Sequence, residues 1–240
     1  MTKKRSQAEA LQTPHVDLRR INGEETRQRI LDVAQELFAR HGYNGVSLRQ
    51  ITTRAKVNVA SIHYHLGSKE HLLLEVLRRG AGPLVEKRDS ALHRLPRPYV
   101  LEDIIRAFVG PVFGEPGAKQ ILFGELRARL VFENNKLIDR MLSELFDEST
   151  RRFVEAIGEC LPNLPRKDLF FRMHYLLGVM TYTMSGPKRA KALSGGSYDL
   201  TESDEGLSQL VNFVAAGFRG PPSGKREKSS RKLPATARAR

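Results

Sequence analysis

The stretch "ETRQRILDVAQELFARHGYNGVSLRQITTRAKVNVASIHYHLGSKEHLLLEVL", residues 25–77, decides how the first part of this chain folds. It opens with apolar residues at spacings of four, three and one, namely Ile30, Ala34, Leu37 and Phe38. Such spacing gathers the apolar side chains on one face of a helix. Gly42 follows, and glycine is a common residue just beyond a helix end. We therefore expect an amphipathic helix that ends at Gly42.

A second, shorter helix is expected to begin after Ser47. Gln50 stands three residues later, and this pair is typical of a capping box, in which each side chain binds the backbone N–H of the other residue. The helix is expected to run to about Lys56. Val57 and Asn58 then form a tight break, because asparagine tolerates the left-handed backbone conformation that such turns use.

A third short helix over residues 59–66 and a long fourth helix complete the pattern. Gly67 ends the third helix, and Ser68 is placed to cap the fourth, which begins at Lys69. A long helix, two short helices and a further helix are typical of a tri-helical helix-turn-helix. Because helices as short as the second and third are not stable alone in water, they must pack on the first. The polar side of the third helix is then left to face a partner.

The residues around the third helix are of types that can bind DNA. Asparagine, serine and histidine bind base edges or phosphates, and tyrosine donates to phosphate oxygens. The outward set is Asn58, Ser61, His63, Tyr64 and His65. Lys69 suits a phosphate because it lies at a helix N-terminus, where free backbone N–H groups add to its charge. Ser47 and Arg49 are expected against the flanking DNA backbone.

Each of these residues also has a plainer interpretation. Ser47 and Ser68 would act only as helix caps, and Tyr64 would pack between helices. His63 and His65 would be ordinary surface residues. Metal binding by this histidine pair is not expected, because a spacing of two on a helix points the side chains apart.

Together, these features resemble a known family. Residues 25–77 resemble the DNA-binding domain of the TetR family of regulators through the segments "ILDVAQELFARHG", "SLRQITTRAKV" and "ASIHYHLGSKEHL". The resemblance implies that Ser47, Tyr64 and Lys69 contact phosphates and that His65 supports or touches the DNA backbone. It also implies that four residues face the major groove: Asn58, Ala60, Ser61 and His63.

Two positions depart from the family pattern. Leu66 stands where the family usually has phenylalanine, which is a change within the core. His63 stands where many members have tyrosine, so the base preference at that position is open.

The rest of the chain is expected to be helical. Proline and glycine clusters separate candidate helices over residues 101–113, 118–132, 134–160, 166–191 and 203–218. The predicted fold class is all-α, with an N-terminal helix-turn-helix domain and, by the resemblance, a C-terminal helical domain that binds a ligand and dimerises. The predicted divisions are a flexible arm over 1–22, the DNA-binding domain over 23–82, the effector-binding and dimerisation domain over 83–219, and a disordered basic tail over 220–240.

The resemblance implies a homodimer that forms through the last two long helices, about residues 168–191 and 203–218. The apolar candidates for the interface are Phe170, Leu177, Met180, Leu210, Phe213 and Val214. Their number fits a four-helix interface. The same residues would also serve to close the core of the protomer itself.

The C-terminal domain is also expected to bind a hydrophobic effector. The candidate lining residues are Phe108, Phe123, Leu126, Arg127, Leu130, Met141, Phe146 and Met180. Apolar residues at helical spacing are equally what a plain core requires, so that alternative stays open. Arg127 or Arg129 would anchor a carboxylate, or would simply be solvated.

A second resemblance concerns the identity of the effector. Residues 164–193, "LPRKDLFFRMHYLLGVMTYTMSGPKRAKAL", resemble the corresponding stretch of PsrA-type, fatty-acid-responsive members of the family, and "VNVASIHYHLGSK" is similar to theirs too. The resemblance implies a long-chain fatty acid or its acyl-CoA as the effector. No residue here specifies an acyl chain, and an unrelated aromatic or drug-like ligand is the alternative.

The basic charge of the chain lies mostly at its ends. The formal net charge is +13; five basic residues stand against two acidic ones in residues 1–20, and seven against one in 221–240, so the ends carry 9 of the 13 charges. Such ends attract phosphates without sequence preference, or they are merely solvated. Residues 25–77, and not the basic ends, therefore indicate DNA binding.

Several other classes of protein are not expected. The single cysteine, Cys160, excludes a disulfide within the chain and a multi-cysteine metal site, and it suits a small buried position. No apolar stretch reaches the roughly 18 residues of a membrane helix, and no secretory signal begins the chain, so we expect a cytoplasmic protein. Phosphate-loop, nucleophile-elbow and zinc-protease motifs are all missing, so we expect no enzyme, no catalytic residues, no metal and no cofactor.

The sequence thus predicts a ligand-responsive repressor that binds double-stranded DNA at a palindromic operator as a dimer. The alternative from another class is a dimeric helical adaptor protein without specific DNA binding.

Overall fold

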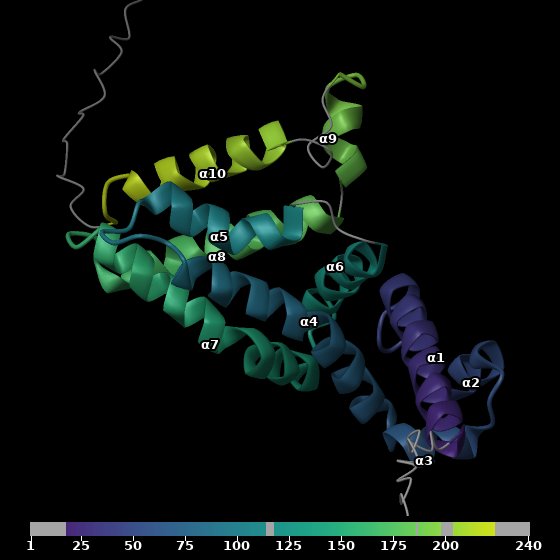
Figure 1. Cartoon of the computed structure of the whole chain (residues 1–240). Coiled ribbons are helices and arrows are strands. Elements are labelled where there is room, and N and C mark those ends of the chain that lie inside the picture. The colour runs from purple at the N-terminus through teal and green to yellow at the C-terminus, as the bar shows by residue number, and fades with distance from the viewer. Residues whose placement is uncertain (1–17, 114–117, 186, 198–203, 224–240) are drawn as a thin grey trace, which may run out of the picture. The chain divides into compact units, whose positions relative to one another are not determined.

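The computed structural model (Figure 1) describes residues 18–113, 118–185, 187–197 and 204–223. All regular structure within these residues is helical, which confirms the all-α fold class. The chain divides into two compact units, and the boundary between them along the chain lies between Val76 and Leu77. Residues 1–17 of the predicted arm and 224–240 of the predicted tail lie outside the described residues.

The described helices follow one another along the chain. The first unit holds α1 (Leu18–His41), α2 (Leu48–Ala55), α3 (Val59–Leu66) and the start of α4 (Lys69–His93). The second unit holds the rest of α4 together with α5 (Leu101–Phe113), α6 (Ala118–Val131), α7 (Lys136–Cys160), α8 (Arg166–Ser185), α9 (Pro187–Leu193) and α10 (Asp204–Arg219). The predicted domain boundary after residue 82 lies further along α4 than the division between the units.

The first unit has a core of its own. Helix α1 packs against α2 and α3, and its apolar stripe is buried as its periodicity predicts. Fully buried side chains come from every helix of the unit, namely Ile30, Ala34, Phe38, Ile51, Ile62, Leu72, Leu73 and Val76. This packing stabilises α2 and α3, which are too short to be stable alone.

Helix α1 begins earlier than the sequence pattern indicates. It starts at Leu18, within the stretch over 1–22 that was predicted to be an arm. Leucine and arginine are good helix formers, and they occupy residues 18–20. Asn22 and Gly23 are weak helix formers, and they hide the continuation of the helix from a search for apolar periodicity.

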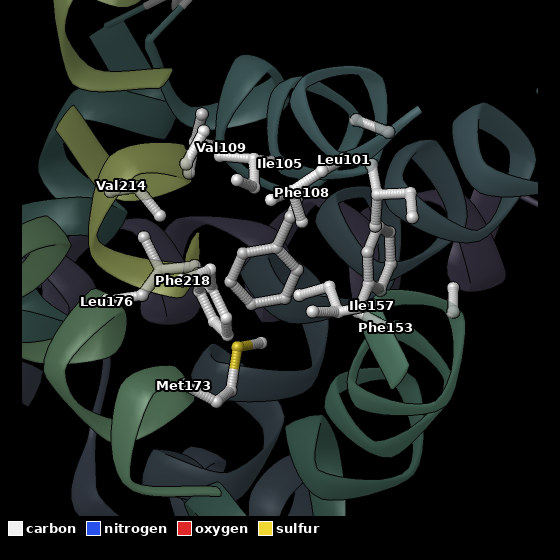
Figure 2. Packing of buried hydrophobic residues seen from close by; sticks show 14 of the residues in the cluster. Leu101, Ile105, Phe108, Val109, Phe153, Ile157, Met173, Leu176, Val214 and Phe218 are labelled. Carbon is white, nitrogen blue, oxygen red and sulfur yellow. The ribbon is translucent and has the colours of Figure 1, made fainter. Parts of the chain in front are cut away.

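The second unit is built around one apolar cluster (Figure 2). Helix α10 packs on α5, α7 packs on α5 and α8, and α6 packs on α8. Figure 2 shows the ring of Phe108 in the middle of this cluster. Its centroid lies 4.9 Å from that of Phe153, with an edge-on arrangement of the two rings. Such pairs add to the stabilisation that apolar burial supplies.

A cluster of partly buried hydrogen bonds joins the end of α10 to α8. The guanidinium of Arg172 donates hydrogen bonds to the carbonyl oxygens of Phe218, Gly220 and Pro221 at 2.6–2.9 Å. These carbonyls lie in the last turn of α10 or just after it, where the backbone lacks its own partners. Asp168, which is 2% exposed, accepts a hydrogen bond from the backbone N–H of Ser223.

The predicted helix over 166–191 was wrong at its end. Helix α8 stops at Ser185, and a separate short helix, α9, begins at Pro187. Proline has no N–H to continue a helix, and it disfavours the helical conformation of the residue before it. Because proline is well suited to the first position of a helix, the chain starts α9 there.

No helix among the described residues has the length and apolar character needed to cross a membrane.

Candidate nucleic-acid interface

Helix α2 begins with the predicted capping box. The backbone N–H of Gln50 donates to Ser47 Oγ at 3.3 Å, and the N–H of Ser47 donates to Gln50 Oε1 at 2.7 Å. Ser47 is therefore a helix cap, as its plainer interpretation has it. Its side chain and that of Arg49 are nevertheless exposed, and both line a shallow groove along α2. They are placed where a partner on the outside of α2 can reach them.

The turn between α2 and α3 differs from the expectation. The left-handed residue is Lys56, with φ 54°, and not Asn58. The N–H of Lys56 bonds back to the carbonyl oxygens of Thr52 and Thr53, which closes the last turn of α2. The helix thus ends at Ala55, and the left-handed position comes two residues before the asparagine.

Helix α3 has one buried face and one exposed face. Ile62 and Leu66 are buried, whereas Ala60 is exposed, as is Asn58 just before the helix. Tyr64 is 85% exposed, so it does not pack between helices of the protomer. The backbone of Ser61, His63 and His65 belongs to α3, but their side chains lie outside the described part of the chain.

Lys69 is held at the start of α4 by an aromatic residue that the sequence pattern did not single out. Lys69 Nζ lies 4.2 Å from the centroid of the Tyr43 ring, in a cation–π contact. Tyr43 is buried and its hydroxyl donates to Glu70 Oε1 at 3.0 Å. In the sequence, the signal for the contact of Tyr43 with Lys69 was the presence of an aromatic residue directly after Gly42.

The beginning of α4 is capped as predicted and carries mixed charge. The backbone N–H of His71 donates to Ser68 Oγ at 3.2 Å. The pKa of the Glu70 carboxyl lies below its ordinary value, because it accepts hydrogen bonds from Ser68, its own backbone N–H and Tyr43. A negative charge at a helix N-terminus is favourable. The negative charge of Glu70 also offsets part of the positive charge of the neighbouring Lys69.

An ion pair ties α4 to α1 within the first unit. Arg27 on α1 donates to the carboxylate of Glu75 on α4. Arg54 on α2 binds Glu36 on α1 at 2.7 Å. These contacts cross between helices whose packing places Ser47, Tyr64 and Lys69 on the outside of one compact unit. The unit therefore presents hydroxyl and ammonium groups of the types that bind phosphates.

The candidate pocket residues of the second unit are nearly all buried. Phe108 and Met180 belong to the packed cluster, at 1% exposure each. Phe123, Leu126, Leu130 and Met141 are buried on α6 and α7, outside that cluster. Arg127 is 9% exposed, and the half-buried ring of Phe146 lies 5.5 Å from its guanidinium. Arg129 is exposed, as a solvated arginine would be.

The candidate dimer residues fall into two sets. Phe170 and Phe213 are exposed, at 44% and 69%, and Leu177 and Leu210 are half-buried. Met180 and Val214 lie inside the core of the unit, at 1% and 6% exposure. The exposed set remains a candidate for contact with a partner, whereas the buried set closes the core of the protomer.

Two family profiles match the chain, one in each unit. Residues 30–76 match the profile described as "Bacterial regulatory proteins, tetR family". Residues 106–217 match the profile described as "Tetracyclin repressor-like, C-terminal domain".

Similar proteins include two transcriptional repressors and a regulator of known structure. The chain is 39% identical to NicS of Pseudomonas putida over 67 residues, which cover 28% of this chain and 32% of NicS. It is 28% identical to KstR of Rhodococcus jostii over 130 residues, which cover 52% of this chain and 61% of KstR. The chain thus spans about a third to three fifths of the length of these two relatives, neither of which is named as an enzyme.

The fold is similar to that of the fatty acid degradation regulator FadR from Bacillus halodurans. The TM-score is 0.57 at 18% identity, and the match covers 81% of this chain and 95% of that chain. The similarity shows that the two chains share a helical fold.

Proposed function

Because the chain belongs to the TetR family of bacterial regulators, we propose that it is a transcriptional repressor that binds a palindromic operator as a dimer. A hydrophobic small molecule bound in the second unit releases the DNA. The observation that carries the proposal is the exposed Tyr64 on α3 together with Lys69, which Tyr43 holds at the start of α4.

In the proposed complex, α3 lies in the major groove. Asn58, Ala60, Ser61 and His63 face the base edges, and Tyr64 and Lys69 contact phosphates on either side. Phosphate contacts fix the position of the protein, and base contacts supply the sequence preference. A two-fold dimer puts its two α3 helices in successive major grooves, about 34–36 Å apart or somewhat more, so the operator is an inverted repeat.

The proposed dimer forms through the exposed faces of α8 and α10. Phe171, Tyr175 and Tyr182 recur along α8 at spacings of four and seven, and they are 47%, 64% and 59% exposed. Phe213 on α10 is 69% exposed. Large apolar side chains that gather on exposed helix faces are typical of protein–protein contacts.

The effector acts by preferring one arrangement of the reading heads over another. Only a difference in affinity between two arrangements can release DNA. Helix α4 is the element that continues from the first unit into the second, so it is the direct route for such coupling. The resemblance of residues 164–193 to PsrA-type regulators makes a long-chain fatty acid or its acyl-CoA the first candidate, and an aromatic or drug-like ligand the second.

Selection of bound sequences from a random duplex pool, at near-physiological salt, tests the DNA-binding part of the proposal. We expect enrichment of an inverted repeat. If a folded, dimeric protein enriches nothing, with or without ligand, the proposal fails and the adaptor alternative gains.

The selected site then tests the individual contacts. Lys69→Ala should weaken binding uniformly across sequences and lower the slope of log affinity against log salt by about one per lysine removed, or about two per dimer. Lys136→Ala is the matched control, since Lys136 is the exposed first residue of another helix, α7. Tyr64→Phe keeps the ring and removes the hydroxyl. An unchanged affinity for this variant would mean that the hydroxyl does not contact DNA.

A further inference from the structure

Arg88, on α4, is buried in the second unit without a complete set of partners. It is 1% exposed. Its Nε donates to the carbonyl oxygen of Phe108 at 2.8 Å, and its guanidinium carbon lies 3.8 Å from the centroid of the Phe108 ring. The terminal Nη2 is buried and has no hydrogen-bond partner among the described residues. A buried cationic donor without a partner is costly, so it indicates a position suited to binding a hydrogen-bond acceptor.

The carboxylate next in sequence does not fill this role. Asp89 accepts a hydrogen bond from Ser149 Oγ at 2.7 Å and one from Arg152 Nη2 at 2.6 Å. Both of these donors lie on α7, and among the described residues the ion pair of Asp89 is with Arg152 and not with Arg88. The unpartnered Arg88 is therefore not one half of an ion pair with Asp89.

A second buried arginine adds positive charge to the same unit. Arg127, on α6, is 9% exposed. Burial, together with the positive charge of Arg127, lowers the pKa of Arg88 to about 9, and the negative charge of Asp89 offsets only part of this effect. Burial likewise lowers the pKa of Arg127 to about 10. Two guanidinium groups that repel each other in a low-dielectric interior make a strong binding site for an anion.

Apolar groups surround the two cations. Arg88 lies over the ring of Phe108 on α5, and Arg127 lies near the ring of Phe146 on α7. The four helices α4 to α7 therefore each contribute one residue to this group of two arginines and two aromatic rings. Leu126 and Leu130, which flank Arg127 along α6, are fully buried. Such surroundings favour an apolar ligand body beside a single charged group.

We propose that Arg88 and Arg127 are the anion-binding pair of the effector site, and that the effector is a monocarboxylate with an apolar body. The pair binds the carboxylate oxygens, with Nη2 of Arg88 as the donor that gains a partner. A carboxylate matches the planar fork of a guanidinium, so one oxyanion satisfies the site. The inference deepens the proposed function, because it names the chemical class of the effector.

The position of Arg88 also suggests how ligand binding affects the DNA-binding unit. Arg88 and Lys69 are carried by the same helix, α4. A carboxylate that binds Arg88 therefore contacts the same helix whose first residue, Lys69, is a proposed phosphate contact.

Calorimetry on the full-length protein, stripped of co-purified apolar molecules, tests the inference. The probes are decanoate, decanol and decanoyl-CoA. We expect decanoate to bind at least about tenfold more tightly than decanol, as a charge-assisted hydrogen bond implies. Equal affinities for decanoate and decanol, or binding of decanoyl-CoA alone, would overturn the proposal.

Variants then assign the anion to the two arginines. Arg88→Met and Arg127→Met should weaken decanoate binding by about tenfold or more and leave decanol binding within about twofold. Arg129→Met is the matched control, because Arg129 is exposed on the same helix two residues away. Unchanged decanoate binding by both core variants would overturn the proposal.

A measurement on the unaltered protein covers the case in which the variants do not fold. The carboxyl carbon of bound [1-¹³C]decanoate reports the pKa of the ligand by NMR. Between two guanidinium groups this pKa should fall below that of free decanoate. A bound pKa at or above the free value would mean that the site holds the neutral acid, which contradicts an arginine pair.

Operator binding, measured separately, distinguishes this inference from the proposed function. If the protein binds the selected operator but no monocarboxylate, the inference about the anion site is wrong and the DNA-binding proposal stands. If the protein binds decanoate through Arg88 but enriches no DNA sequence, the DNA-binding proposal is wrong and the inference about the anion site stands.

Discussion

The two units place their cationic side chains in opposite ways. In the first unit, Arg49 is exposed and Lys69 lies at an accessible helix start, 4.2 Å from a buried aromatic ring that orients it. In the second unit, Arg88 and Arg127 are 1% and 9% exposed and lie over the rings of Phe108 and Phe146. A macromolecule can reach only the first kind of charge, and a small molecule that enters the core is suited to the second. The difference teaches that the position of a charge relative to the core, more than its residue type, indicates the partner.

Removal of a core ring from the second unit is the largest perturbation that should leave the first unit intact. Phe153 is fully buried against Phe108, so Phe153→Ala should lower the free energy of unfolding by about 3–5 kcal/mol. Denaturant unfolding measures the loss. Phe132→Ala is the control, since Phe132 is 75% exposed and should change stability by less than about 0.5 kcal/mol. If DNA affinity falls in Phe153→Ala under conditions where both units remain folded, the two units are more strongly coupled than the comparison assumes.

Two glycines on α4 test how tightly this helix is packed where it enters the second unit. A Cβ on Gly80 would lie 2.2 Å from the ring of Phe123, whereas one on Gly82 would meet nothing within 4 Å. Gly80→Ala should therefore destabilise the protein by about 1–3 kcal/mol. Gly82→Ala should change stability by less than about 1 kcal/mol, because the gain in helix propensity is offset by the restriction that Pro83 imposes on the residue before it. Equal thermal unfolding midpoints for the two variants would contradict the close contact of α4 with α6.

Ser47 sharpens the comparison on the side of the first unit, because its hydroxyl caps α2 and is also a proposed phosphate contact. Ser47→Ala should cost about 1 kcal/mol of stability, and Ser47→Gly only a few tenths. Both variants lose the hydroxyl, so both should bind the operator more weakly if it contacts DNA. Thr53→Ala, at an exposed position of the same helix, is the control. Full operator affinity in Ser47→Gly would leave Ser47 as a cap alone.

The smallest expected effect concerns acid stability of the first unit. The pKa of Glu70 in the folded protein lies below its ordinary value of 4.5, owing to hydrogen bonds from Ser68, its own backbone and Tyr43. A lowered folded-state pKa contributes stability above the unfolded value, and this contribution is lost as the pH falls through the folded value. Glu70→Gln should therefore flatten the decline in stability below about pH 4.5, by a small amount because the carboxylate is exposed. Thermal unfolding at several pH values checks this, with Glu125→Gln on α6 as the control. A decline as steep as that of the unaltered protein would remove Glu70 from the acid response.

Most helices were predictable because their signals are local. The capping box of Ser47 and Gln50, the glycine after α3 and the apolar stripe of α1 are all patterns among near neighbours. The errors have local causes too. The break before α9 came from Pro187, whose signal was available in the sequence. The left-handed residue after α2 is Lys56 because the helix ended at Ala55, a register that differs by one residue from the prediction.

The sequence by itself determined where the helices lie and which residue types face outward on α3, because periodicity and caps depend on residues a few positions apart. Only the tertiary structure decided which charged groups are enclosed. Arg127 and Arg129 are two residues apart on one helix, yet one is buried and the other exposed. Arg88 continues the buried stripe of Leu77 and Ala81 along α4, but its burial depends on Phe108, twenty residues away. Burial is a property of contacts between distant segments, and neighbouring residues do not encode it.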